Sequence, residues 1–284
     1  MLHSMVEDQA AGLRRMLGKQ NTKNFVVLSA IAASQKNSFL LNLASSLIYA
    51  GNSTHILDMR TDQSGVSARV QSLIKSSLWD IAKKSQPLQA CFYEFIQGGR
   101  ISQLSKLAIS EIVSQTSTID HLSKIIQSLS MDSNIWLLDA DLKQDNPYLI
   151  TDFVESETIL IVSSSPSSIK NGYSQLKHIA NNYGRRKIGL LVINADDAQA
   201  QLIYKNIATA SKDYLSVQLD FVGFIPEDDY LSKSALLGKS IIDAFPLSKA
   251  SHAFRTIAES LMNKKSPSFV PKISLNSQPL VLEH

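Results

Sequence analysis

The sequence contains little of several features that would assign a protein to a particular class. Its single cysteine, Cys91, cannot form an intramolecular disulfide, and we expect it to be a small buried hydrophobic residue. No apolar run reaches the roughly 18 residues of a membrane-spanning helix. Lysine and arginine number 28 and aspartate and glutamate 25, so the charge does not favour nucleic acid as a specific partner. We expect a cytoplasmic globular protein, because the N-terminus also lacks the pattern of a secretory signal.

Glycine is missing from a loop where it would normally be required. Residues 25–50 read as a buried strand, a short loop and a helix, which is the frame of a phosphate-binding loop, yet residues 29–37 are SAIAASQKN. A phosphate loop presents backbone N–H groups from residues at positive φ. Each non-glycine residue forced into that conformation costs roughly 1–2 kcal/mol. Either this loop has another shape, or it holds no nucleotide.

Short apolar runs and segments of helical period alternate along the rest of the chain. The runs are nearly continuous in hydrophobicity, as strands buried on both faces must be. This alternation predicts an α/β fold with a doubly wound, mostly parallel sheet and helices on both faces. We predict strands at residues 25–29, 55–57, 135–138, 158–162, 188–193 and 221–225.

The remaining segments complete the expected organisation. Residues 64–131 are helix-rich and should hold at least one further strand, with a turn at Gly98-Gly99. The last helix should cover about residues 250–263, and the tail after it has three prolines and no periodicity. We therefore divide the chain into an N-terminal segment 1–20, an α/β domain 21–264 and a tail 265–284, whose final Leu-Glu-His we treat as tag-derived.

Two motifs stand near the ends of the chain. Residues 8–14 read DQAAGLR, and residues 221–261 contain a strand ending in Gly-x-Ile-Pro-x-Asp, a helix, a Phe-Pro turn and a last helix. The whole chain, most strongly at these two ends, resembles the MinD/ParA family of deviant Walker-A ATPases. Within that family it resembles the FlhG/FleN branch, which regulates flagellar number and placement and carries a DQAxxLR motif like residues 8–14. The resemblance implies a P-loop NTPase-like fold of the MinD type.

The departures from the family lie in the chemistry. Alignment of the family's GGKGGVGKT with residues 29–37 matches Lys36 to the phosphate-binding lysine, but Asn37 replaces the Ser/Thr that ligates Mg²⁺. Ile31 replaces the signature lysine that reaches the partner subunit's nucleotide. After the second predicted strand, Arg60 stands where a second carboxylate helps to activate water. These losses imply that ATP hydrolysis, and with it ATP binding, has been lost.

Several positions still mark where a nucleotide would lie. Asp139 matches the Walker-B aspartate and Asp58 the first carboxylate after the second strand, while relatives use the equivalents of Asn194 and the Ile-Pro loop to contact adenine. The residual nucleotide-binding positions implied by the resemblance are Lys36, Asn37, Asp58, Asp139, Asn194 and Pro226. No catalytic residue and no metal ligand is expected.

Two of these signals also have a simpler interpretation. Without a phosphate loop around it, Lys36 is expected to be a solvated lysine at a helix N-terminus, since one point charge in water contributes only about 1 kcal/mol at 4 Å. Asp58, Asp139 and Asp141 follow strands at the edge where open α/β sheets bind ligands. They either hold a cation or cap the following turns.

The N-terminal segment has a narrow apolar stripe. Val6, Ala10, Leu13 and Leu17 recur at helical spacing beside two arginines. Such a helix either folds back onto its own domain or docks its apolar face in a partner's groove. In the flagellar branch it resembles the activating peptide offered to the FlhF GTPase, which implies the partner-binding residues Asp8, Gln9, Ala10, Leu13 and Arg14.

The sequence thus favours a non-hydrolysing regulatory binding protein in flagellar biosynthesis or polar positioning, without a cofactor. The alternative is an active ATPase with an unusual loop, which would use ATP and Mg²⁺ through Lys36, Asp58 and Asp139. A third possibility is another small anion or nucleotide-like ligand in the same cleft. Any homodimer should form without nucleotide, because Ile31 brings no charge across the interface. The proline-containing tail cannot form an amphipathic membrane-binding helix.

Overall fold

The structure is a computed structural model of the 284-residue chain, and it describes residues 22–84, 86–142, 146–184 and 186–263. The N-terminal segment with Asp8, Gln9, Ala10, Leu13 and Arg14 lies outside the described residues. The tail 265–284 lies outside them as well. The partner-binding role expected for the N-terminal segment and the absence of a membrane-binding helix expected for the tail therefore remain predictions from the sequence.

In the described residues the chain builds one sheet of eight strands in the order β3-β4-β2-β5-β1-β6-β7-β8. All neighbouring strands pair in parallel except β3, which is antiparallel to β4. The central position of β1, between β5 and β6, is typical of a doubly wound sheet. The strands are β1 Lys23–Ser29, β2 Thr54–Asp58, β3 Phe92–Ile96, β4 Gly99–Gln103, β5 Ile135–Asp139, β6 Glu157–Ser163, β7 Ile188–Ile193 and β8 Leu219–Ile225.

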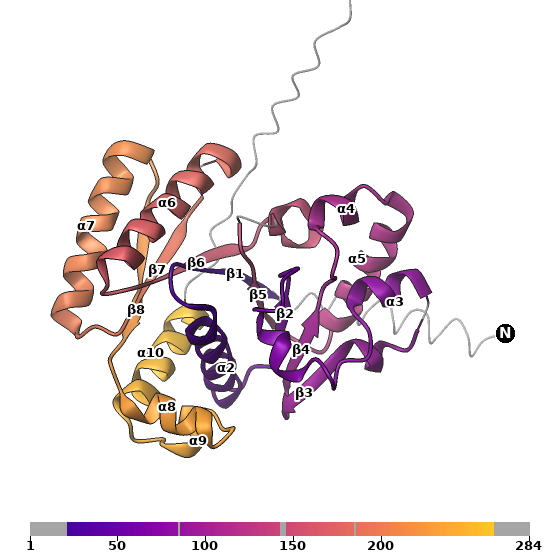
Figure 1. The fold of residues 1–284 in the computed structure, drawn as a ribbon, viewed down its shortest axis with the longest axis horizontal. Coiled ribbons are helices and arrows are strands. Elements are labelled where there is room, and N and C mark those ends of the chain that lie inside the picture. Colours follow the sequence, from indigo (N-terminus) through magenta and orange to yellow (C-terminus); the bar gives the residue numbers. More distant parts are fainter. Residues whose placement is uncertain (1–21, 85, 143–145, 185, 264–284) are drawn as a thin grey trace, which may run out of the picture.

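Helices cover both faces of this sheet (Figure 1). They form because apolar residues recur at helical spacing and turn towards the strands. The helices are α2 Ala33–Tyr49, α3 Leu78–Lys84, α4 Ile109–Val113, α5 Thr116–Ser130, α6 Pro166–Tyr183, α7 Asp197–Leu215, α8 Asp229–Leu236, α9 Ile241–Ala244 and α10 Lys249–Asn263. Short 3₁₀ turns include η1 Val66–Val70, which follows β2.

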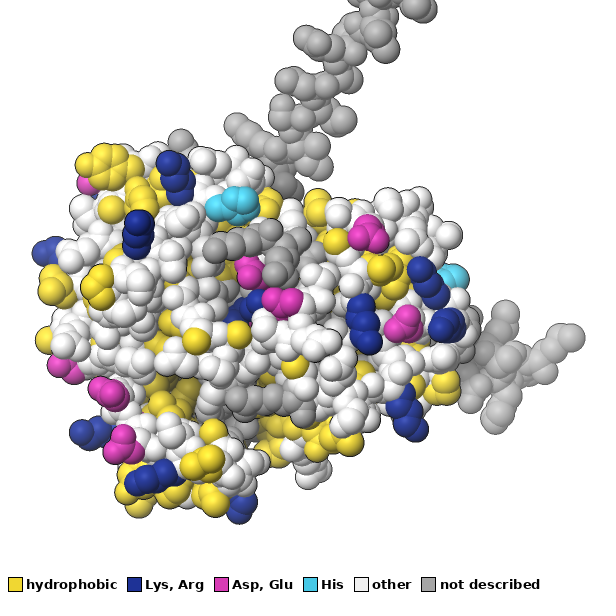
Figure 2. Space-filling view, in the orientation of Figure 1, with side chains coloured by type: hydrophobic (Ala, Val, Ile, Leu, Met, Phe, Trp, Pro, Cys, Tyr) yellow, Lys and Arg dark blue, Asp and Glu magenta, His cyan; other side chains and the backbone are white. Residues whose placement is uncertain are grey.

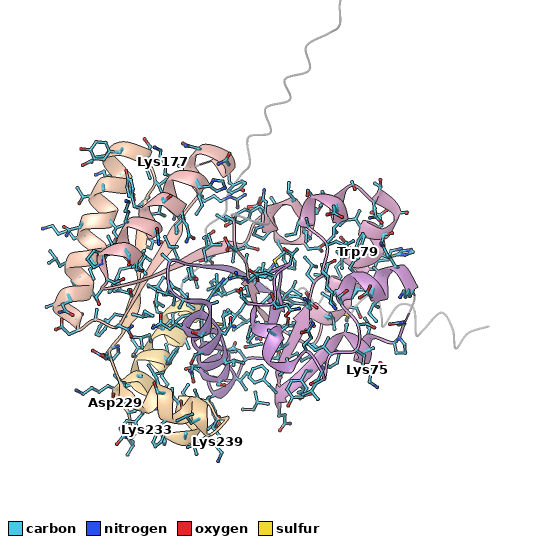
Figure 3. All side chains as sticks on the ribbon, viewed as in Figure 1. Lys75, Trp79, Lys177, Asp229, Lys233 and Lys239 are labelled. Atoms are coloured by element: carbon cyan, nitrogen blue, oxygen red, sulfur yellow. The ribbon has the colours of Figure 1, made fainter. Side chains whose placement is uncertain are left out.

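The sheet separates two hydrophobic cores. On one face α2 and α10 pack on alternate residues of β1, including Phe25 and Val27. On the other face α3, α5, α6 and α7 pack on Val26, Leu28 and their neighbours. Trp79, labelled on α3 in Figure 3, is 2% exposed and belongs to this second core. Burial on both faces explains why the parallel strands are nearly continuous apolar runs.

The predicted fold class is confirmed. Every strand predicted from an apolar run is present, with ends shifted by at most a few residues. Two further strands, β3 and β4, lie within residues 64–131, where at least one was expected, and the turn between them contains Gly98 at φ 81°. Cys91 is buried as expected, and Trp79 and Trp136 are core residues as well.

Some large apolar side chains remain on the surface. The space-filling view shows hydrophobic side chains gathered over α8 and α9 (Figure 2). Leu236, Leu237 and Leu247 are among the most exposed apolar residues of this region. Among the described residues, no helix is both long and apolar enough to cross a membrane.

Candidate nucleotide-site remnant

The loop after β1 is much shorter than a phosphate-binding loop. The backbone of Ala30 still bonds to β6, and α2 begins at Ala33. Among the described residues, the positive φ angles outside glycine are those of Asn194 and Ser216, so residues 29–37 contain none. Without positive φ the N–H groups cannot form a concave nest. The loop therefore has another shape, and half of the aligned motif is simply the first turn of a helix.

Lys36 is buried, so the expectation of a solvated lysine is wrong. Its side chain is 1% exposed, and its Nζ lies 2.5 Å from Oδ1 of Asp139 as an ion pair without hydrogen-bond alignment. The same Nζ donates a hydrogen bond of 2.8 Å to the carbonyl of Ala140. A buried lysine needs such partners, because an isolated charge in the interior is strongly unfavourable. Lys36, at the phosphate-binding position of the motif, is thus neutralised by Asp139, at the Walker-B position.

Asn37 binds the protein's own backbone. Its Nδ2 donates hydrogen bonds of 3.0 and 3.1 Å to the carbonyl oxygens of Ser64 and Gly65. These carbonyls belong to residues 64–67, which we call the covering segment because it lies over the ends of β2 and β5. At the position where a Ser/Thr hydroxyl would ligate Mg²⁺, this chain therefore has an amide that fixes a loop.

The two buried carboxylates, those of Asp58 and Asp139, accept hydrogen bonds from the covering segment. Oδ2 of Asp139 accepts from the backbone N–H of Val66 at 2.9 Å. Oδ2 of Asp58 accepts from the N–H of Ser67 at 3.0 Å and from its hydroxyl at 2.5 Å. Both aspartates thus cap the start of η1. We call Lys36, Asn37, Asp58 and Asp139 the strand-end cluster.

Gly65 of the covering segment packs directly against the carboxylate of Asp58. A Cβ at Gly65 would collide with both carboxylate oxygens of Asp58, which explains the glycine there. Burial, followed by the charge of Asp139, raises the pKa of Asp58 to about 6. A carboxylate at a magnesium site would instead be kept ionised by the metal.

Arg60 forms a second, more exposed charge cluster. Its guanidinium binds Asp62 through two hydrogen bonds of 3.0 and 2.9 Å and lies 3.7 Å from Asp141. The hydrogen bond from Arg60 holds the pKa of Asp62 well below its usual range. Arg60, which stands where the family has a carboxylate, therefore pairs with the nearby acids Asp62 and Asp141. Among the described residues, no group of three or more His, Cys, Asp or Glu side chains could hold a metal ion.

Two cavities remain on either side of the N-terminus of α2. One, of about 390 Å³, is lined by Phe39, Asn194, Ile225 and Glu227, and we call it the base cleft. Asn194 has φ 56°, and its carbonyl accepts a hydrogen bond from Ser164. Pro226 follows Ile225 between two lining residues. The other cavity, of about 590 Å³, is more polar and is lined by Ile31, Gln35, Arg60 and serines of the turn before α6.

The structure thus joins four of the predicted positions into one cluster and places Asn194 and Pro226 at a separate cleft. Sequence reasoning missed residues 64–67, which complete the cluster. The one local signal for them was Gly65, and its close approach to Asp58 depends on the folded chain.

Solved structures with the same arrangement of strands and helices are numerous. MinD of Aquifex aeolicus has a TM-score of 0.62 at 15% identity, covering 86% of this chain and 98% of its own. A ParA family ATPase from Chlorobium tepidum has a TM-score of 0.60 at 16% identity, covering 84% and 99%. This is the MinD/ParA fold. A MinC:MinD cell division complex of A. aeolicus matches similarly, with a TM-score of 0.63 at 16% identity, covering 87% and 98%.

One curated relative connects the MinD/ParA fold to a narrower branch. The antiactivator FleN of Pseudomonas aeruginosa is 26% identical over 233 residues, which cover 79% of this chain and 80% of FleN. No family model matches the sequence. The resemblance to the MinD/ParA family and its FlhG/FleN branch is confirmed.

Proposed function

We propose that this chain is a FlhG/FleN-like regulatory binding protein that neither hydrolyses nor binds ATP. The observation that supports this most is the covering segment. Lys36 is neutralised by Asp139, and Asn37 is bonded to Ser64 and Gly65. Phosphate and Mg²⁺ would have to displace these contacts and find donors in a loop without a nest. The protein would act in the cytoplasm through protein contacts, in flagellar biosynthesis or polar positioning.

Calorimetry with Mg-ATP tests the nucleotide part of this proposal. We expect no saturable heat up to millimolar nucleotide with the wild-type protein. Micromolar binding that disappears in Lys36→Ala would support the alternative, an active ATPase using Lys36, Asp58 and Asp139. The matched control is Lys233→Ala, which removes a lysine from α8, away from the strand-end cluster.

The partner would be bound by the N-terminal segment. Its likeness to the activating peptide of the flagellar branch supports an FlhF-type GTPase, with Gln9 and Arg14 as polar contacts and Ala10 and Leu13 on the apolar face. A pull-down should compare the full chain with a variant that starts at Asn21. Loss of the GTPase from the shortened variant is expected, and equal recovery would remove the segment from the proposal. Gln9→Ala with Arg14→Ala provides the same test at full length.

A homodimer that assembles without nucleotide is part of the same proposal. Ile31 lines the polar cavity beside α2, where the family's lysine would extend towards the partner's phosphate. An apolar side chain there has no interaction with a γ-phosphate. Sedimentation with and without Mg-ATP should give the same oligomeric state, and dimerisation only with Mg-ATP would contradict the proposal.

The base cleft favours a second candidate, a small nucleotide-like ligand that needs no phosphate loop. The cleft is hollow, has Asn194 on its wall, and carries Glu227, Asp228 and Asp229 at its rim. These acids disfavour a ligand with several phosphates in this cleft. Titration with adenosine, compared between wild type and Phe39→Ala, tests this candidate.

A further inference from the structure

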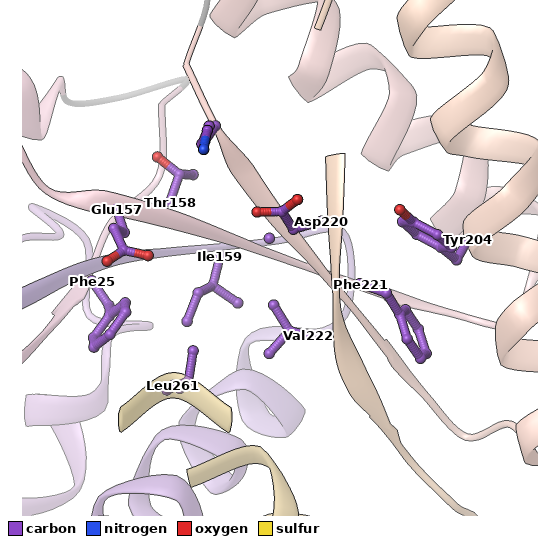
Figure 4. Close-up of a pocket in the computed structure, with 11 residues that line it drawn as sticks. Phe25, Glu157, Thr158, Ile159, Tyr204, Asp220, Phe221, Val222 and Leu261 are labelled. Atoms are coloured by element: carbon purple, nitrogen blue, oxygen red, sulfur yellow. The ribbon is translucent and has the colours of Figure 1, made fainter. Parts of the chain in front are cut away.

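A separate cavity of about 380 Å³ opens at the opposite edge of the sheet, where the parallel strands begin. Glu157 is the first residue of β6, and Asp220 is the second of β8. Figure 4 shows the side chains of Ile159, Val222 and Leu261 converging between these two acids. The cavity therefore has an apolar floor and an acidic rim, and among the described residues Lys187 is the cation that lines it.

The end of α10 forms one wall of this cavity. Nζ of Lys23, the first residue of β1, donates hydrogen bonds of 3.0 and 2.8 Å to the carbonyl oxygens of Leu261 and Met262. These bonds satisfy carbonyls that a helix C-terminus leaves without partners. They also fix the end of α10, whose Leu261 lines the cavity together with Phe25.

The sequence that follows complements the cavity in charge and hydrophobicity. Residues 264–271 read KKSPSFVP: two lysines come first, and Phe269 and Val270 follow. Two lysines suit a rim with two carboxylates, and an aromatic and a β-branched residue suit an apolar floor. The five residues before Phe269 are a usual loop length, can span up to about 17 Å and include a proline that favours a turn.

We propose that residues 264–271 of this chain dock into this cavity. Lys264 and Lys265 lie at the acidic rim near Glu157 and Asp220, and Phe269 covers Ile159, Val222 and Leu261. The segment ties the last helix to the starts of β6 and β8, across the sheet from the strand-end cluster. The proposal is independent of whether the protein binds nucleotide.

Photo-cross-linking in the full-length protein tests this docking. The photoreactive amino acid p-benzoylphenylalanine replaces Phe269, which keeps an aromatic side chain at that position. After irradiation, mass spectrometry should find residue 269 joined to peptides containing Phe25, Ile159 or Val222 of the same molecule. The same amino acid in place of Leu280, outside the proposed segment, is the matched control and should give no such product.

Charge variants sharpen the test without depending on a single substitution. Lys264→Gln with Lys265→Gln should lower the cross-link yield about two- to fivefold, as expected for partly exposed ion pairs. Lys187→Gln removes a like charge and should leave the yield unchanged or raise it. Cross-links to other surfaces, or an unchanged yield without the lysines, would overturn the proposal. A mixture of isotope-labelled and unlabelled protein identifies cross-links between two molecules, and these would also overturn it.

Discussion

The strand-end cluster and the base cleft lie on two sides of the same helix end, and they differ in how completely the protein fills them. In the strand-end cluster, Lys36 and Asp139 pair with each other and the covering segment takes up the remaining polar groups. The base cleft keeps a cavity of about 390 Å³. In the function that we propose, the protein's own groups therefore take the place of the phosphate and metal contacts, while the space for a base is left open.

This difference follows from electrostatics. Buried charged groups that lose a ligand are strongly unfavourable until other partners replace it. The base cleft loses much less when it is empty, because water can fill it and hydrate the acids at its rim. The comparison predicts large effects of substitution in the cluster and small effects in the cleft.

The largest effect is expected for Lys36→Ala. It leaves the Asp139 carboxylate, 0% exposed, without its charge partner. Breaking a buried pair by removing one member costs about 3–5 kcal/mol. Urea unfolding of Lys36→Ala should show this loss, and the double variant Lys36→Met with Asp139→Asn should recover part of it. If Lys36→Ala has wild-type stability, the pair does not hold the cluster together.

A pH-dependent effect is expected for Asp58→Asn. Because the folded-state pKa of Asp58 is raised from 3.8 to about 6, its contribution to stability is greatest below pH 4 and is lost as the pH rises through 6. Relative to the variant, the wild type should therefore lose about 2 kcal/mol between pH 4 and pH 7. Denaturant midpoints at several pH values measure this difference. A difference that does not change with pH would mean that Asp58 ionises normally.

A smaller effect is expected for Asn37→Thr, which restores the family's hydroxyl. It removes the two hydrogen bonds to Ser64 and Gly65 and should cost about 1–3 kcal/mol, because buried carbonyls lose their donors. Thermal unfolding with and without Mg-ATP is the measurement. Stabilisation of this variant by Mg-ATP would show that one hydroxyl is enough to recover the site.

The smallest effect is expected for Asn194→Gly in the base cleft. Asn194 has φ 56°, which glycine adopts without strain. The hydrogen bond from Ser164 goes to the backbone carbonyl and is kept. The free energy of unfolding should change by less than about 0.5 kcal/mol. A loss of unfolding free energy as large as that of Lys36→Ala would contradict the difference between the base cleft and the strand-end cluster.

The fold could be predicted from sequence because its signals are local. Runs such as residues 188–193 are buried on both faces and read as strands without knowledge of their neighbours. The burial of Lys36 and its contacts could not be predicted, since its carbonyl partner, Ala140, is 104 residues away along the chain. Asn37 was recognised as a departure from the family, but its role depends on residues 64–65 folding over it.

Hydrogen exchange at the backbone amides of Val66 and Ser67 is the most direct test of the covering segment. These two N–H groups donate to Asp139 and Asp58, so their exchange reports whether the cluster is closed. We expect slow exchange that is the same with and without millimolar Mg-ATP. Exchange that becomes faster or slower on addition of Mg-ATP would show that nucleotide enters the cluster, and would contradict the replacement of its phosphate and metal contacts by the protein itself.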